Sequence, residues 1–241
     1  MIKIENDEVL GWEHAIRGMR NPMNSWDKSD SVFGGKFSYG KREVSFSIGK
    51  NDLNLMMRLR NAGTDHRKFM RMLTVYVDIT APLYWWKEFD TYKVGTTANS
   101  TSTMHKLAST PITLDCFETD DYDPNLLISE PEYGDKEMPF RGFVENLIEG
   151  LEELRQKYNE TKDKRYWKEL IRWLPNGWLQ TRTVTMNYEN ILSMVHQREH
   201  HKLTEWSGSG ETFTNESFIK FATSLPYMQD FLIAAKPGFE M

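Results

Sequence analysis

Two histidines near the end of this chain have the spacing of metal ligands. His196 and His200 lie four positions apart, and His201 and Glu205 repeat that interval. A zinc hydrolase would also need a third ligand, an open coordination position and a general base. The HExxH order is absent, because Glu199 precedes His200 rather than following His196. Exposed helix histidines are commoner than ligands, so we predict no metal site.

A polar triple extends along the same segment. Asn187 and Arg198 are eleven positions apart, close to three helical turns, and Glu205 follows seven positions later. On one continuous helix the three side chains would share a face with Ile191 and Met194. Burying an unpaired arginine is costly. Arg198 therefore either pairs with Glu205, tying the helix to a neighbour, or points into a ligand site.

The segment 95–102, GTTANSTS, is rich in hydrogen-bond donors. It offers backbone amides and five hydroxyl side chains. Such groups bind phosphate by the same physics as anion binding at helix N-termini and in backbone nests. The GxxxxGK[ST] pattern of nucleotide triphosphatases is absent. A purely structural turn is the alternative interpretation.

Hydrophobic periodicity predicts the elements that position these groups. Residues 74–80, TVYVDIT, alternate apolar and polar side chains, which indicates a half-buried strand that Ala81-Pro82 ends. An aromatic helix follows. Residues 178–187 predict another strand, and 188–206 predict one long helix with Asn187 as its N-cap.

The other segments predict short strands and amphipathic helices. The helix at 51–63 has Asn51 or Asp52 as its cap and ends at Gly63. The remaining expectations are a strand at 1–5, helices at 9–19, 140–158 and 165–175, a hairpin at 37–50 and one or two closing helices at 218–235.

The composition limits the class of protein. With 241 residues, 39% of them hydrophobic, the chain can bury a substantial core, and we expect a single domain over 1–241. The net charge of −5 argues against nucleic acid as a partner. No signal peptide or long apolar run is evident, so we expect a cytoplasmic protein without a membrane segment.

One stretch and one residue stand apart from this pattern. Residues 115–137 carry nine carboxylates and one lysine, in a spacing that does not match a calcium loop. We predict a solvated surface insertion at about 115–138. Cys116 is the single cysteine, which excludes an internal disulfide and a cysteine-based zinc site.

Residues 60–105 and 174–206 together resemble one family, the flavin-dependent thymidylate synthases. That family carries a Gly-His…Glu-His segment, a strand ending in Ala-Pro, and a helix leading to R-H-R-x-x-S-x-N-x-x-S-x-R. Ala81-Pro82 matches the strand end, and His66 falls on the early histidine. With one inserted residue, the later motif falls on Thr91, Tyr92, Lys93, Thr96, Asn99, Ser102 and, at its final arginine, Met104.

The second half of the resemblance is gap-free. The family has a Leu-Pro, a strand, then N-x-R-x-x-x-N-x-x-x-x-R and a glutamate seven residues beyond. Glu189 stands where the family has a flavin-contacting arginine, and Ser193 where it has asparagine. The matching positions are Leu174-Pro175, Asn187, Arg198 and Glu205.

The resemblance implies an α+β fold of the thymidylate-synthase-complementing type, mostly antiparallel sheet packed with long helices, in a homotetramer. It implies methylation of dUMP to dTMP with FAD as cofactor, NADPH as reductant and methylenetetrahydrofolate as carbon donor. Arg198 would hold the uracil edge as the catalytic residue. Substrate would meet Lys93, Thr96, Ser102 and Arg198, and the cofactor would meet His66, Thr91, Tyr92, Lys93, Asn99, Asn187 and Ser193.

Several family cations are missing here. Arginines are lost at Thr91, Met104 and Glu189, and Lys93 is the positive charge that remains in the R-H-R motif. Each charge-assisted hydrogen bond to phosphate contributes about 1.5–3 kcal/mol, and Glu189 would repel a phosphate. The chain is then either a divergent synthase or a non-catalytic oligomeric binding protein on the same fold. In the first case other cations compensate, the candidates being Arg67, Lys68, Arg71 and Lys87.

Overall fold

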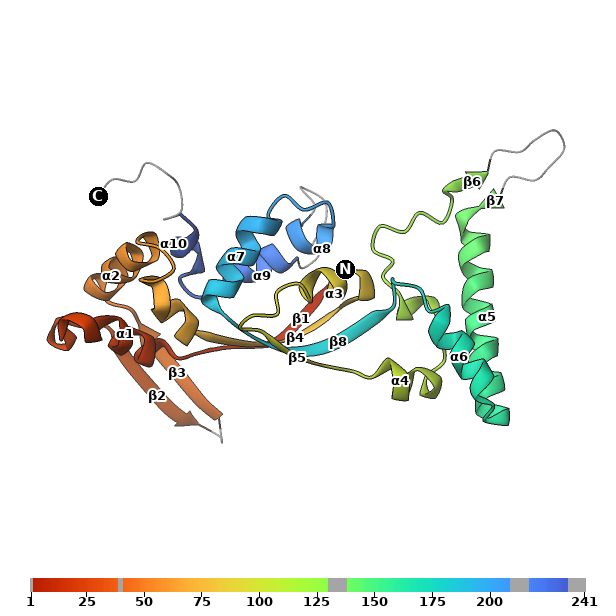
Figure 1. Ribbon diagram of the computed structural model, residues 1–241, viewed down its shortest axis with the longest axis horizontal. Coiled ribbons are helices and arrows are strands. Elements are labelled where there is room, and N and C mark those ends of the chain that lie inside the picture. Colours follow the sequence, from red (N-terminus) through yellow and green to blue (C-terminus); the bar gives the residue numbers. More distant parts are fainter. Residues whose placement is uncertain (1, 39–40, 130–137, 209–216, 234–241) are drawn as a thin grey trace. The chain divides into compact units, whose positions relative to one another are not determined.

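The computed structural model describes residues 2–38, 41–129, 138–208 and 217–233 as a mixture of helices and antiparallel sheet (Figure 1), which confirms the predicted fold class. The strands are β1 Lys3–Leu10, β2 Val32–Ser38, β3 Lys41–Ser47, β4 Thr74–Pro82, β5 Thr97–Ser100, β6 Leu127–Ser129, β7 Met138–Pro139 and β8 Leu179–Asn187. The α-helices are α1 Trp12–Arg20, α2 Lys50–Asn61, α3 Leu83–Phe89, α4 Thr103–Lys106, α5 Phe140–Thr161, α6 Lys164–Arg172, α7 Tyr188–Arg198, α8 Thr204–Ser207, α9 Phe218–Ser224 and α10 Met228–Ile233. Short 3-10 helices are η1 Asn21–Met23, η2 Trp26–Lys28, η3 Arg67–Met72, η4 Leu107–Ser109 and η5 Leu114–Cys116.

The largest sheet has the strand order β1-β4-β8-β5, and β2-β3 and β6-β7 form separate pairs. Strand β4 alternates as its sequence predicts, with Val75, Val77 and Ile79 buried and Tyr76 exposed. Pro82 is both its last residue and the N-cap of α3. The predicted strand at 178–187 is confirmed as β8. No helix in the described ranges is long and apolar enough to span a membrane.

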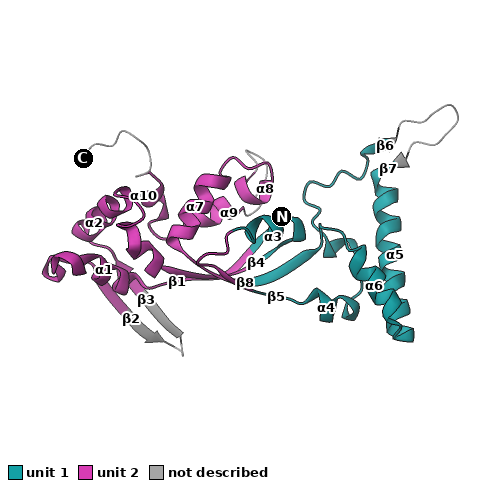
Figure 2. Ribbon diagram, in the orientation of Figure 1, with its two compact units in different colours: residues 1–3, 79–91, 99–182 teal, residues 4–78, 92–98, 183–241 magenta. Residues whose placement is uncertain are grey.

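The chain folds into two compact units (Figure 2). Unit 1 holds residues 1–3, 79–91 and 99–182, and unit 2 holds 4–78, 92–98 and 183–241. Strands β4 and β8 both continue from one unit into the other, so neither unit is a single stretch of sequence. The expected single domain over 1–241 stays a prediction.

Helix α5 carries the core of unit 1. Its predicted amphipathic pattern is confirmed, because Leu151 packs in a buried cluster with residues from α6 and from the segment 107–117. Glu152 fixes that segment to the helix. Its carboxylate accepts hydrogen bonds from Arg155 Nη2 at 2.6 Å and from the backbone amide of Ile112 at 2.8 Å.

We expect Glu152→Gln to lower the free energy of unfolding at pH 7 by about 1.5–3 kcal/mol, the contribution of a hydrogen bond to a charged group. The Arg155 hydrogen bond is the largest influence on the pKa of Glu152, which falls from 4.5 to about 2. The stabilisation is therefore complete above pH 4.5 and is lost as the pH falls toward 2. Urea unfolding of the unmodified protein and of Glu152→Gln at pH 7 and pH 2.5 measures the difference in their free energies of unfolding. A difference that is as large at pH 2.5 as at pH 7 contradicts this prediction.

The acidic segment 115–137 contributes to this core as well as to the surface. Phe117 is buried and packs edge-on against the ring of Trp178, with ring centroids 5.5 Å apart. Residues 126–128 are exposed. The remainder of the predicted insertion, 130–137, lies outside the described residues.

The predicted cap of α2 is wrong. Gly49 is the N-cap, and the carboxylate of Asp30 accepts the amides of Asn51 and Asp52 at 2.9 and 3.1 Å. Asp52 is instead buried inside the first turn, where it pairs with Arg20 Nε at 2.6 Å. The capping carboxylate comes from a residue about twenty positions away, so local pattern does not reveal it. The predicted helix end is confirmed, since Gly63 has a φ of +101° just after α2.

Candidate functional site

Residues 92–98 lie along helix α7 within unit 2. Asn190 Nδ2 donates to the carbonyl of Val94 at 2.8 Å. Tyr92 OH donates to Gln197 Oε1 at 3.2 Å and accepts from Arg198 Nε at 2.9 Å. The residues just before the polar segment 95–102 are thereby fastened to both ends of one helix. Of that segment, residues 95–98 lie in unit 2 and residues 99–102 lie in unit 1.

The N-terminus of α7 is closed by a reciprocal cap. Asn187 Oδ1 accepts the amide of Asn190 at 3.0 Å, and Asn190 Oδ1 faces the amide of Asn187 at 3.4 Å, which confirms the predicted N-cap. Gly95 packs onto this cap with a φ of +79°. A Cβ there would lie 2.8 Å from Asn190 Oδ1, so only glycine permits this approach.

Replacing Asn190 with alanine tests this attachment. We expect a loss of about 1 kcal/mol of stability, typical of a lost capping interaction, and faster amide exchange across residues 92–98. Ser193→Ala is the matched control, because Ser193 is exposed on the same helix and contacts only Gln197 in α7. Equal exchange rates in both variants would contradict the role of Asn190.

Arg198 ends α7 between two aromatic rings. Its guanidinium carbon lies 5.6 Å from the ring centre of Tyr92 and 5.3 Å from that of Trp206. Cation–π contacts and the Tyr92 hydrogen bond together fix the orientation of the guanidinium plane. A half-buried, oriented arginine is a suitable bidentate partner for a planar ligand.

The single long helix predicted over 188–206 is wrong. Helix α7 ends at Arg198, and a separate turn of helix, α8, begins at Thr204. Between them the ring of His201 accepts the amide of Leu203 at 3.1 Å, which stabilises a non-helical connection. Arg198 and buried Glu205 therefore do not share a helix face, although both lie in unit 2.

The histidine pair is separated by the same break. His196 is on α7, whereas His200 lies beyond its end. The near neighbour of His196 Nε2 is the Arg60 guanidinium, 3.3 Å away, which is no partner for a metal ligand. Among the residues that the structure describes, no three His, Cys, Asp or Glu side chains are grouped to hold a metal ion. The zinc hydrolase interpretation has no support in this geometry.

Glu189 does not present an isolated negative charge. Arg67 Nε and Arg71 Nε lie 2.8 and 3.0 Å from its two carboxylate oxygens. The three side chains carry a net charge of +1, so the expected repulsion of phosphate by Glu189 is offset. Of the candidate compensating cations, Arg67 and Arg71 thus reach α7, whereas Lys87 bonds to Asn176 in unit 1.

The remaining predicted residues divide between the units. Unit 2 also holds exposed His66, at the start of η3, and exposed Lys93. Thr96 lies there too, with its hydroxyl donating to the carbonyl of Tyr92. In unit 1 the hydroxyls have structural partners: Thr91 donates to the carbonyl of Glu88, and Ser102 caps α4. Asn99 is exposed on β5 and Met104 is exposed on α4.

Sequence reasoning missed Asn190 and Gln197. An asparagine three positions after the Asn187 cap is the signal of a capping box, with asparagine in place of the usual Glu or Gln. Nothing local marks Gln197, because its partner Tyr92 lies 105 positions away.

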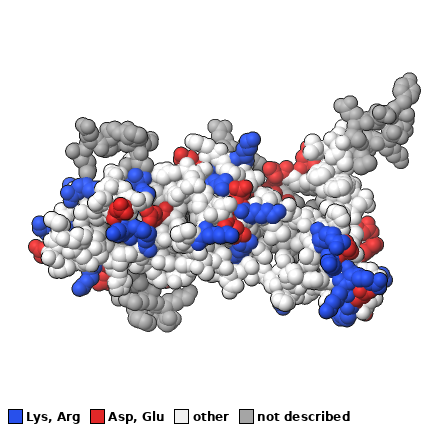
Figure 3. Space-filling view, in the orientation of Figure 1, with Lys and Arg blue, Asp and Glu red and all other residues white. Residues whose placement is uncertain are grey.

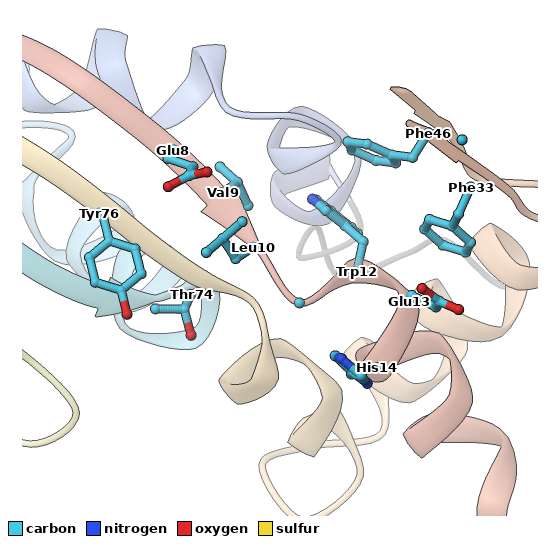
Figure 4. Close-up of a pocket in the computed structure, with 12 residues that line it drawn as sticks. Glu8, Val9, Leu10, Trp12, Glu13, His14, Phe33, Phe46, Thr74 and Tyr76 are labelled. Carbon is cyan, nitrogen blue, oxygen red and sulfur yellow. The ribbon is translucent and has the colours of Figure 1, made fainter. Parts of the chain in front are cut away.

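A large open cavity lies elsewhere in unit 2 (Figure 4). It has a volume of about 770 Å³, with aromatic side chains of Trp12, Phe33 and Phe46 on one side and Thr74 and Tyr76 on the other. Among the residues that the structure describes, two carboxylates line it and no arginine or lysine does, which does not suit a phosphate. The described lining contains no residue predicted for the site. It consists of Glu8, Val9, Leu10, Gly11, Trp12, Glu13, His14, Phe33, Gly34, Phe46, Thr74 and Tyr76.

The net charge of −5 does not favour a nucleic-acid interface. On the face shown in Figure 3, basic and acidic side chains are mixed over most of the surface, and a group of basic side chains gathers at the lower right beside some acidic ones. Binding a nucleic-acid backbone requires a continuous surface of basic side chains.

Comparison with known proteins identifies the fold. No protein-family model and no curated protein sequence matches the chain. The structure is similar to that of the flavin-dependent thymidylate synthase ThyX from Helicobacter pylori complexed with FAD and dUMP, with a TM-score of 0.60 and 14% identity over 95% of this chain and 97% of that one. It is also similar to the UMP/dUMP methylase PolB from Streptomyces cacaoi, with a TM-score of 0.53 and 14% identity over 92% of this chain and 86% of that one. The chain therefore has the fold of the flavin-dependent thymidylate synthases, as the resemblance of its sequence implies.

Proposed function

We propose that this protein is a flavin-dependent pyrimidine nucleotide methylase that acts at helix α7. The observation that carries the proposal is the fixed guanidinium of Arg198, held by Tyr92 and Trp206 beside residues 92–98. Solved proteins of the same fold are complexed with FAD and dUMP or with 5-bromo-dUMP. The finer proposal is conversion of dUMP to dTMP by a cytoplasmic homotetramer, with methylenetetrahydrofolate as carbon donor and NADPH as reductant.

The residues present fit an anionic, planar cofactor. Segment 92–98 approaches α7 through a glycine whose position leaves no room for a Cβ, and the helix N-terminus supplies its partial positive charge. The group Arg67–Glu189–Arg71 adds a net positive charge next to it. The predicted cofactor residues of unit 2 would meet the flavin: His66, Tyr92, Lys93, Asn187 and Ser193.

The protein groups would bind and polarise the nucleotide. A bound flavin supplies the reducing hydride. Arg198 orients the uracil edge and stabilises negative charge that develops on its carbonyl oxygen, as preorganised donors do. Lys93 and Thr96, which lie in unit 2 with Arg198, would contact the nucleotide, with Lys93 supplying the positive charge for its phosphate. No cysteine nucleophile is required, which agrees with a lone Cys116 in unit 1.

The visible spectrum of the purified protein, followed by titration with FAD, tests the proposal. We expect bound flavin, or FAD uptake that approaches one per chain, and formation of thymidylate in a cell that lacks its own synthesis. Arg198→Gln should abolish complementation, whereas Arg172→Gln, on an exposed position of α6, should preserve it. Absence of flavin and of FAD uptake would refute it.

A non-catalytic binding protein is the second candidate. The observation that favours it is the absence of cations at Thr91 and Met104, both of which are exposed. Flavin or nucleotide binding without thymidylate formation would support this second function over the first.

A further inference from the structure

A buried arginine near α7 has no carboxylate partner. Arg60, in the last turn of α2, is only 7% exposed. Its Nη1 lies 3.4 Å from Asn61 Oδ1, its Nη2 lies 3.3 Å from His196 Nε2, and its buried Nε has no hydrogen-bond partner. Within the described ranges no carboxylate lies at ion-pairing distance from it. Among the described residues, this buried positive charge therefore has no carboxylate to compensate it.

Another buried arginine of unit 2 has the carboxylate partner that Arg60 lacks among the described residues. Arg20 is equally buried, at 4% exposed, but it pairs with Asp52 at 2.6 Å. A buried charge without a partner is strongly destabilising, whereas a hydrogen-bonded carboxylate partner offsets much of the cost of its desolvation. Packing alone therefore does not explain an arginine at position 60, since an apolar side chain would fill that volume at lower cost.

The groups around Arg60 add positive charge. Helix η3 packs against both α2 and α7, and it brings Arg67 close to Arg60. Burial and the charge of Arg67 lower the pKa of Arg60. Burial, Arg60 and Arg67 lower the pKa of His196, and Glu199 opposes them. Glu189 is already held by two arginines, so it does not supply the missing negative charge.

We propose that Arg60, Arg67 and His196 form a binding site for a phosphate group. Three elements, α2, η3 and α7, supply nitrogen donors to one place, and several donors around a compact dianion suit phosphate better than a carboxylate. His196 is exposed and the Arg67 side chain is 25% exposed, so a phosphate can reach them from solvent with Arg60 behind. This site does not include Arg198. It shares Arg67 with the cationic group that the proposed function places beside the flavin, so the test begins with protein free of nucleotide and flavin.

Inorganic phosphate is the probe, added to nucleotide-free protein at constant ionic strength with chloride as the compensating anion. Thermal unfolding and the imidazole NMR signals of His196 are followed. We expect a saturable rise in Tm and an upward shift in the His196 pKa as phosphate binds, and a weaker effect of acetate. If neither Tm nor the His196 pKa responds to phosphate in the unmodified protein, the inference is overturned.

Arg60→Met distinguishes a ligand-binding role from a structural one. We expect it to unfold at the same or a higher temperature than the unmodified protein without phosphate, and to bind phosphate at least about tenfold more weakly, as for one lost charge-assisted bond. Arg58→Met, on an exposed position of the same helix, should leave phosphate binding unchanged. Destabilisation by Arg60→Met with an unchanged phosphate affinity overturns the proposal.

A surface substitution keeps the test decisive if Arg60→Met does not fold. His196→Gln, on the exposed side of α7, should weaken phosphate binding severalfold without loss of the folded state, and an unaltered affinity counts against the site. Titration with FAD then identifies the source of the phosphate. If FAD competes with inorganic phosphate, the site binds a phosphate of the flavin. If FAD binds without displacing inorganic phosphate, the site belongs to a second ligand. Failure of FAD to bind at all bears on the proposed function and leaves the phosphate measurements intact.

Discussion

Asp52→Ala should lower the free energy of unfolding by about 3–5 kcal/mol, the cost of breaking a buried ion pair. The substitution leaves Arg20, which is 4% exposed, without its partner. It also removes the acceptor of two hydroxyls, Ser29 Oγ and Ser31 Oγ, each 2.7 Å from the carboxylate, and of the amides of Asp30 and Ser31. Urea unfolding at pH 7 measures the loss.

The pH dependence identifies the charge as the cause. Burial raises the pKa of Asp52, but hydrogen bonds from Ser31, Ser29 and Arg20 outweigh it, and the net pKa lies below 3.8. The stabilisation is therefore present above pH 3.8 and is lost as the pH falls through the lower, folded-state pKa. Glu160→Ala removes an exposed pair with Lys157 and should cost less than about 1 kcal/mol. Equal losses in the two variants would rule out this account.

Arg198→Lys should reduce turnover by about a hundredfold or more, which is typical of removing one preorganised donor to a developing charge. Lysine keeps the positive charge but has neither the planar fork nor the Nε that donates to Tyr92 OH. The affinity for dUMP should also fall at least about tenfold. Single-turnover kinetics of the flavin-loaded protein and dUMP titration measure the two effects.

A pair of variants separates orientation from charge. Tyr92→Phe keeps the ring beside Arg198 and removes its hydroxyl, so we expect an effect between those of the unmodified protein and Arg198→Lys. Arg172→Lys, at an exposed position of α6, is the matched control and should leave both turnover and dUMP affinity unchanged. Full activity of Arg198→Lys would show that a positive charge alone suffices. The contacts of Arg198 with the rings of Tyr92 and Trp206 would then have no catalytic role.

Local pattern predicted those elements whose determinants are local. Strand β4 follows from alternation, the N-cap of α7 from Asn187, and the end of α2 from Gly63, because each depends on residues within a few positions. Features set by distant partners were not predictable. The cap of α2 comes from Asp30, and the turn after Arg198 depends on His201 and α8, so a periodic pattern continued the helix too far.

The same distinction between local and distant determinants applies to the candidate site. The motif spacing located Arg198, Asn187, Tyr92, Lys93 and Thr96, which all lie in unit 2. It also named Thr91, Asn99 and Ser102, which lie in unit 1. The lost arginine at Glu189 suggested repulsion, because sequence alone cannot show that Arg67 and Arg71 surround the carboxylate from 122 and 118 positions away. Charge compensation is a property of spatial neighbours, and only the structure reveals it.

Strands β4 and β8, which both cross between the two units, are far apart in the sequence, and this affects folding during synthesis. Strand β4 meets β8 through Thr80 and Thr181 in unit 1, and through Asp78 and Thr183 in unit 2, pairs separated by 101 and 105 positions. At about 5–20 residues per second, β4 leaves the ribosome roughly 5–20 seconds before its partner. During that interval the strand that carries Val75, Val77 and Ile79 lacks β8, one of its two neighbours in the sheet. Holding chaperones therefore have their best opportunity to bind the nascent chain at this strand.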